Sequence, residues 1–146
     1  MSERTSSTIV VDAPPARVMA VIADLTAYPE WVSSVRSVEV VSVYDDAMER
    51  PAQATFVLDA GAIKDTYTLE YSWDDDREVR WTLLDAQILT AMDGVYRLTA
   101  APSNATEVQY ELTLDLKIPM IGLLRRKAEK VITDTALKEL KKQVEG

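Results

Sequence analysis

The chain has 146 residues, enough for one domain with a sizeable core and too few for two, so residues 1–146 are expected to form a single domain. It contains no histidine and no cysteine, which excludes Ser-His-Asp and Cys-His catalysis, zinc sites of thiolate or imidazole ligands, and disulfides. Its 16 Lys and Arg against 24 Asp and Glu give a formal net charge of −8, so a nucleic acid is not expected as a partner.

The beginning of the chain predicts one short strand and two short helices. Residues 8–11 are apolar and β-branched, which favours a strand. Asp12 then precedes two prolines, the pattern of a helix N-cap with proline in the first turn, and an apolar stripe at helical spacing follows over 16–25. A second short helix is expected through 30–32, after a break at Tyr28-Pro29.

The middle of the chain is rich in β-branched and aromatic residues, in short runs separated by polar turns. Strands are predicted at 35–44, 53–59, 64–73, 78–84, 90–100 and 106–117. Their apolar residues alternate with polar ones, most clearly at Tyr67, Leu69 and Tyr71. Such one-sided burial is typical of an antiparallel sheet with a solvated outer face. The charged residues Glu70, Arg80, Arg97, Glu111 and Asp115 are expected on that outer face.

The last part of the chain predicts one long amphipathic helix, from just after Gly122 nearly to Gly146. Its apolar stripe consists of Leu124, Ala128, Val131, Ile132, Thr135 and Leu140. A curved sheet with one apolar face needs a cover, and this helix alone is long enough to supply it. The predicted fold is therefore α+β: a helix-grip, in which a curved seven-stranded antiparallel sheet wraps around the long C-terminal helix, with two short helices after the first strand.

Three segments carry a family resemblance. They are Tyr-Pro-Glu-Trp-Val at 28–32, Asp-Ala-Gly-Ala-Ile-Lys-Asp at 59–65 and Lys-Ala-Glu-Lys at 127–130. Together they resemble the polyketide cyclase/dehydrase branch of the START-like (SRPBCC) superfamily, over roughly residues 7–144. The resemblance implies the helix-grip fold, and it implies a function within a superfamily that includes lipid carriers, coenzyme Q-binding proteins and aromatase/cyclases.

The loops of the predicted sheet differ in chemistry between its two ends. In an antiparallel meander, alternate loops lie at the same end, so 60–63, 85–89 and 118–122 gather at one end and are unusually apolar. Clustered apolar loops often mark a binding site, which predicts the mouth of a cavity. The mouth residues would be Ile63, Lys64, Ile88, Leu89, Met120 and Ile121. The alternative is that these loops fold inward and cap the core.

Aromatic and aliphatic residues on the predicted inner faces suit an apolar cavity with a few polar groups. The candidate ligand-binding residues are Tyr67, Leu69, Tyr71, Trp73, Trp81, Leu83, Tyr96, Tyr110, Leu112, Leu124, Ala128 and Ile132. They predict binding of a hydrophobic small molecule, such as a lipid, an isoprenoid or quinone, or a polyketide, for carriage, sequestration or presentation. The alternative is that the aromatic residues fill a solid core and their hydroxyls reach water at strand ends.

Catalysis is the second functional hypothesis, and it rests on the resemblance. The family's cyclases commonly use an Arg and a Tyr in the pocket, but here 32–35 has no Tyr and 69–71 has no Arg. No catalytic residue, metal ligand or cofactor is therefore assigned. A third hypothesis is a protein-interaction module that uses the apolar loop end. Whether the chain is a monomer or a dimer does not follow from the sequence.

Several polar segments allow two interpretations. Asp59, Lys64 and Asp65 could hold a polar headgroup or cap a hairpin. The acidic run 74–76 is interpreted as a solvated turn. Within 118–127, apolar residues lead into three cations, a pattern that could serve transient contact with an anionic membrane surface. The alternative is that these residues start a helix, with the apolar ones in the core and the cations paired with the chain's own acids. Residues 1–7 lack a signal-peptide pattern and no apolar run reaches the ~20 residues that span a bilayer, so a cytoplasmic location is expected.

Overall fold

The computed structural model describes residues 5–45, 48–59, 64–117 and 122–146, with side chains in the last segment from residue 126 onward. The elements in chain order are β1 (Thr5–Val11), α1 (Pro15–Ala23), the 3-10 turn η1 (Leu25–Ala27), α2 (Tyr28–Trp31), β2 (Val35–Val43), β3 (Pro51–Asp59), β4 (Lys64–Asp74), β5 (Glu78–Ala86), β6 (Leu89–Ala101), the 3-10 turn η2 (Pro102–Asn104), β7 (Ala105–Leu116) and α3 (Gly122–Glu145).

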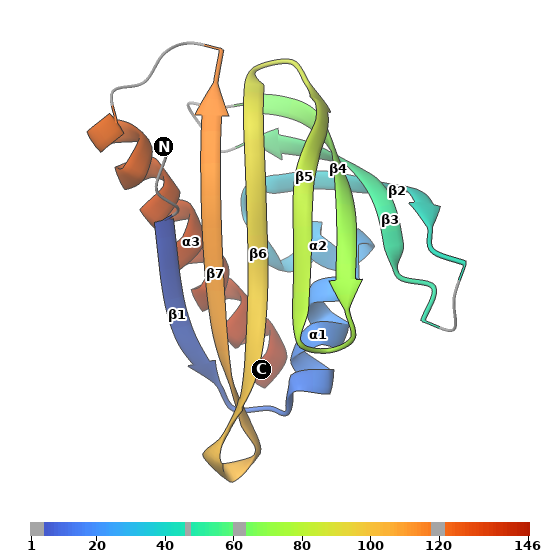
Figure 1. The fold of residues 1–146 in the computed structure, drawn as a ribbon, viewed down its shortest axis with the longest axis vertical. Coiled ribbons are helices and arrows are strands. Elements are labelled where there is room, and N and C mark those ends of the chain that lie inside the picture. Colours follow the sequence, from blue (N-terminus) through green and yellow to red (C-terminus); the bar gives the residue numbers. More distant parts are fainter. Residues whose placement is uncertain (1–4, 46–47, 60–63, 118–121) are drawn as a thin grey trace.

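All seven strands form one antiparallel sheet in the order β1-β7-β6-β5-β4-β3-β2. The sheet curves, and α3 packs along β1 and β7 on its concave side (Figure 1). The short helix α2 lies next to β2 at the other edge, and α1 contacts α3, β6 and β7. Irregular register in β2, between Thr68 and Leu69 in β4, and between Leu89 and Ala91 in β6 helps the strands to bend. The predicted helix-grip fold is confirmed.

The two faces of the sheet separate apolar from charged residues, as the alternation predicts. Inward-facing Val108 and Leu112 are fully buried together with Leu140 of α3. On the outer face, Glu78 accepts hydrogen bonds from Arg80 (Nε to Oε2, 3.0 Å) and from Arg97 (Nε to Oε1, 2.9 Å). The solid part of the core therefore lies between β1, β7 and the C-terminal half of α3.

One local prediction is wrong at the first helix. The residue that precedes α1 is Pro14 and no side chain caps the helix, so Asp12 is not its N-cap. A cap must directly precede the first helical residue, and the two prolines place the helix start beyond the reach of Asp12. The backbone N–H of Asp12 instead donates to Oε2 of Glu145 at 2.8 Å, which ties the end of β1 to the end of α3. The helix also ends at Ala23, before Leu25 enters η1.

The acidic turn between β4 and β5 is fixed by arginines. Asp74 pairs with Arg77 at 2.9 Å and Asp76 pairs with Arg50 at 2.6 Å. Asp75 adopts a positive φ of 51°, as a tight turn requires. Among the helices of the described residues, none combines the length and the apolar character that crossing a bilayer requires.

Candidate functional site

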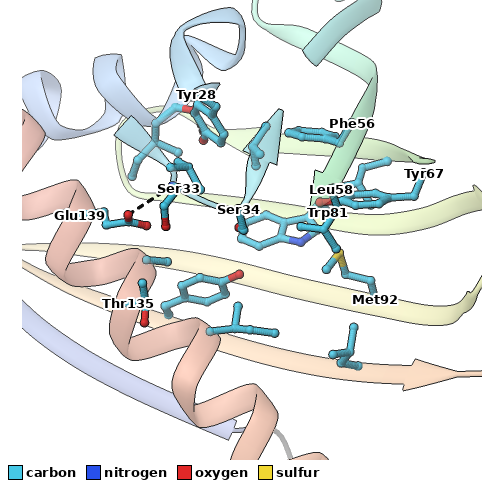
Figure 2. A pocket seen from close by; sticks show the side chains of 18 of the residues that line it. Tyr28, Ser33, Ser34, Phe56, Leu58, Tyr67, Trp81, Met92, Thr135 and Glu139 are labelled. Carbon is cyan, nitrogen blue, oxygen red and sulfur yellow. Dashed lines mark hydrogen bonds between the residues drawn. The ribbon is translucent and has the colours of Figure 1, made fainter. Parts of the chain in front are cut away.

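A cavity of about 470 Å³ lies between the sheet, α3 and the connection from α2 to β2 (Figure 2). Each strand from β3 to β7 contributes residues of its inner face, since every second side chain points inward. The lining residues are Ile22, Tyr28, Trp31, Val32, Ser33, Ser34, Val35, Phe56, Leu58, Asp59, Tyr67, Leu69, Tyr71, Trp81, Leu89, Met92, Tyr96, Tyr110, Leu114, Val131, Ile132, Thr135, Ala136 and Glu139. The cavity is within the size range of small-molecule sites and is mostly apolar.

Aromatic rings pack against one another along the sheet side of the cavity. The rings of Phe56 and Tyr67 stack at a centroid distance of 5.3 Å. The ring centroid of Trp81 lies 5.4 Å from that of Tyr96 and 5.6 Å from that of Tyr110. The ring centroids of Tyr96 and Tyr110 are 4.6 Å apart. Such contacts fix the ring orientations, so the wall is largely preformed.

Tyrosine hydroxyls supply most of the polar groups inside. No described residue forms a hydrogen bond with the hydroxyls of Tyr67, Tyr71, Tyr96 and Tyr110. Every fully enclosed polar side-chain atom of the described residues does have a partner, so these four hydroxyls are not fully enclosed. These oxygens therefore border the open volume of the cavity. Tyr28 differs, because its hydroxyl donates to the carbonyl of Ile22 at 2.5 Å.

The same tyrosines are held in their neutral form. Burial raises the pKa of Tyr67 far above the ordinary value, and the nearby Asp65 carboxylate adds to the effect. Burial likewise raises the pKa of Tyr71, Tyr96 and Tyr110. The hydroxyls consequently stay protonated and can donate or accept hydrogen bonds, but they are poor proton donors to a reacting group.

The cavity meets solvent between α3 and the α2–β2 connection. Its exposed lining residues are Ser33 on that connection and Val131 and Thr135 on α3. Across this opening, Oε2 of Glu139 accepts a hydrogen bond from the backbone N–H of Ser33 at 3.2 Å (Figure 2). Asp59, also in the lining, pairs with Arg36 at 3.0 Å.

The observed opening is formed by residues other than those of the predicted mouth. Leu89 lines the cavity and is buried, whereas Lys64 is exposed, Ile88 is half-buried, and neither belongs to the lining. Ile63, Met120 and Ile121 lie outside the described residues. The opening between α3 and the α2–β2 connection depends on how elements distant in sequence pack together, which strand alternation does not reveal. A further opening at the loop end stays a prediction.

The predicted ligand-binding set divides into two groups. Tyr67, Leu69, Tyr71, Trp81, Tyr96, Tyr110 and Ile132 line the cavity. Trp73, Leu83, Leu112 and Ala128 do not, and the side chain of Leu124 lies outside the described part. Trp73 lies at the far end of β4, where its Nε1 donates to the carbonyl of Pro51 at 2.7 Å, and Leu112 is sealed within the solid core. Leu83 and Ala128 are half-buried outside the cavity.

The carboxylate of Asp65 is held by backbone N–H groups, most of them from the β5–β6 turn. Its carboxylate accepts backbone N–H groups from Thr66 at 2.8 Å, Gln87 at 3.0 Å, Ile88 at 3.0 Å and Leu89 at 2.9 Å. Burial disfavours the charge, but these donors outweigh it and lower the pKa of Asp65. Of the two interpretations of this segment, the hairpin cap is therefore the one that the geometry favours for Asp65, which fixes the β5–β6 turn next to Leu89.

Sequence reasoning missed several lining residues. Phe56, Leu58 and Met92 alternate inward on their strands and could have been included on the same ground as Tyr67. Gly94 gave a signal too, since a glycine inside a strand often marks close approach of another group. A Cβ at Gly94 would lie 2.2 Å from Cζ2 of Trp81, so the indole rests directly on this strand. Glu139 gave no signal, because a charged residue on an amphipathic helix is usually solvated.

Residues 11–141 match the family described as polyketide cyclase / dehydrase and lipid transport. No curated protein matches significantly. The fold is similar to a START superfamily protein from Mycobacterium smegmatis, with 18% identity, 97% of each chain covered and a TM-score of 0.90.

Two further solved structures share the fold. A protein from Thermus thermophilus has 25% identity, 97% coverage of each chain and a TM-score of 0.79. The ZhuI aromatase/cyclase from Streptomyces sp. R1128 has 16% identity, covers 98% of this chain and 93% of its own, and has a TM-score of 0.76.

Proposed function

The chain belongs to the polyketide cyclase/dehydrase and lipid transport family, and from this premise we propose that it binds a hydrophobic small molecule in its internal cavity, for carriage, sequestration or presentation. The observation that carries the proposal is the cavity of about 470 Å³, whose walls are mainly aliphatic and aromatic. A solid core would leave no such space, because protein interiors normally pack without voids much larger than a water molecule.

The driving force would be the transfer of apolar ligand surface from water into this preformed space. Each CH₂ group that becomes buried contributes ~0.8 kcal/mol, before the cost of immobilising the ligand. Since the ring contacts of Trp81, Tyr96 and Tyr110 already order the wall, little further ordering of side chains is needed.

Orientation of the ligand would come from the cavity's polar groups. The hydroxyls of Tyr67, Tyr71, Tyr96 and Tyr110 are available, because no described residue occupies them. A ligand that bears a carbonyl, ether or hydroxyl oxygen would satisfy one or more of them, and a plain hydrocarbon would not. The ligand would thus combine an apolar body with at least one oxygen function.

Catalysis of the cyclase/dehydrase type is less well supported. Efficient general acid–base catalysis needs a group whose pKa lies near the working pH, and burial moves the phenols well away from that range. The charged lining residues that the structure describes, Asp59 and Glu139, both lie at the opening and are engaged by Arg36 and Ser33. The described geometry therefore favours holding a molecule over transforming it.

The proposal also includes transient contact between residues 118–127 and an anionic membrane surface. Arg126 and Lys127 are exposed near the start of α3, where cations close to an anionic bilayer contribute ~1 kcal/mol each. In a vesicle sedimentation assay, the double variant R126Q/K127Q should lose binding to anionic phosphatidylserine vesicles, and neutral phosphatidylcholine vesicles serve as the control. Equal sedimentation of variant and wild type would contradict this contact.

The binding proposal is tested with the apolar fluorophore N-phenyl-1-naphthylamine. We expect saturable binding of one probe per chain, and loss of binding in Ala136→Trp, whose new indole would fill the cavity from α3. Ala100→Trp is the matched control, since Ala100 is exposed on β6 and does not line the cavity. If both variants bound the probe as the wild type does, the cavity would not be its site.

A further inference from the structure

The charged side chains that line the described cavity are all acidic. Among the lining residues that the structure describes, the charged side chains are Asp59 and Glu139, and no lysine or arginine is included. Asp59 is compensated by Arg36, whose Nη2 lies 3.0 Å from its carboxylate. Glu139 has no ion pair within the described chain; its one hydrogen-bond donor is the neutral N–H of Ser33. Among the described residues at the opening, the charge of Glu139 therefore has no cationic partner.

The neighbourhood of this charge is aromatic and partly desolvated. Glu139 is half-buried at the edge of a cavity lined by Tyr28, Trp31 and Tyr96. The rings of Tyr28 and Trp31 meet edge to face at 5.0 Å. Burial raises the pKa of Tyr96, and the nearby charge of Glu139 adds to this effect. Aromatic faces attract cations, and they do so more strongly where water is excluded.

These observations restrict the ligand's charge. A carboxylate or sulfonate would enter beside Glu139 and would meet no lysine or arginine of the described lining, in a protein whose net charge is already −8. A protonated amine would be attracted both by the carboxylate and by the ring faces. Resting on the proposed function, we propose that the natural ligand is an amphiphilic cation, whose amine group lies against Glu139 at the opening while its apolar body occupies the cavity.

The inference is tested by isothermal titration calorimetry with three naphthalene probes that share one ring system: naphthalen-2-ylmethylamine, naphthalen-2-ylmethanol and naphthalene-2-carboxylate. At neutral pH the amine should bind about fivefold to tenfold more tightly than the alcohol, as expected for one partly exposed ion pair supplemented by ring contacts. The carboxylate should bind most weakly. The amine-to-alcohol affinity ratio should fall about threefold or more in Glu139→Gln, because only the ring contacts then favour the amine; the amide oxygen of the variant can still accept the Ser33 N–H.

The control variant is Glu107→Gln, which removes the same charge from an exposed position on β7 that does not line the cavity. It should keep the wild-type ratio. An amine that binds no better than the alcohol, or a ratio that survives Glu139→Gln or is lost in Glu107→Gln, would overturn the inference while the binding proposal stands. If none of the three probes bound, the proposed function itself would fail. Thermal melting of each variant verifies that it is folded.

Discussion

Replacement of Gly94 by alanine perturbs the cavity wall at one defined point. The added Cβ would lie 2.2 Å from Cζ2, 2.3 Å from Cε2 and 2.6 Å from Nε1 of Trp81. Because ordinary contact begins at 3.4 Å, the indole must move by about 1.2 Å, from 2.2 to 3.4 Å. Gly94 is on the inner face of β6, so the ring moves away from the strand and into the cavity. Overpacking of this kind costs about 1–3 kcal/mol of stability.

Two measurements are needed on the Gly94→Ala variant. Urea unfolding should show the loss of stability at an unchanged m-value, and titration with N-phenyl-1-naphthylamine should show weaker binding because the displaced indole occupies ligand space. The variant Trp81→Phe has a smaller ring and therefore a smaller conflict with the added Cβ, so the double variant G94A/W81F should be more stable than the sum of the single effects predicts. Additive effects, or a Gly94→Ala protein with wild-type stability and affinity, would refute the placement of Trp81 against β6.

Two other predictions concern hydrogen bonds near the cavity. Asp65→Asn should lower the free energy of unfolding by about 1–3 kcal/mol, because an amide cannot replace a carboxylate that accepts several N–H groups. The folded pKa of Asp65 is lowered, so its stabilising effect is present above the unfolded pKa and is lost as pH falls through the folded pKa; the difference between variant and wild type in urea unfolding should therefore shrink in acid, and a constant difference would contradict the assignment. Tyr110→Phe should change stability by less than about 0.5 kcal/mol, whereas Tyr28→Phe should cost about 1 kcal/mol through loss of its bond to Ile22; equal effects in thermal unfolding would argue against the unpartnered hydroxyl.

The fold was accessible from the sequence because its signals are local and repeated. Period-two alternation on β4, β5 and β7 identified the inner face, including Tyr67, Trp81 and Tyr110, all of which line the cavity. The helical period after Gly122 identified α3 as the cover, but the predicted stripe was wrong in part, because Val131 is exposed whereas Glu129 and Thr133 are buried. These patterns depend only on which side of an element is buried, and that information is present in the spacing of apolar residues.

Where the cavity ends, and which residues meet at its opening, depends on how the elements pack in three dimensions. Trp73 shares a face with Tyr71, yet it lies past the end of the cavity, where the Arg50 guanidinium is 5.3 Å from its ring. Alternation gives the face of a strand but not the position along it at which a cavity ends. Ser33 and Glu139 are 106 residues apart and meet only because α3 passes beside the α2–β2 connection. No spacing rule brings such a pair together.

The most direct test of an internal binding site is to locate a bound molecule. A crystal structure of the protein with naphthalen-2-ylmethanol should show density for the probe between Trp81, Tyr96 and Ile132, with its hydroxyl within hydrogen-bond distance of at least one tyrosine oxygen. Density for the probe on the outer surface alone, with these three side chains packed against one another and no space between them, would contradict the account.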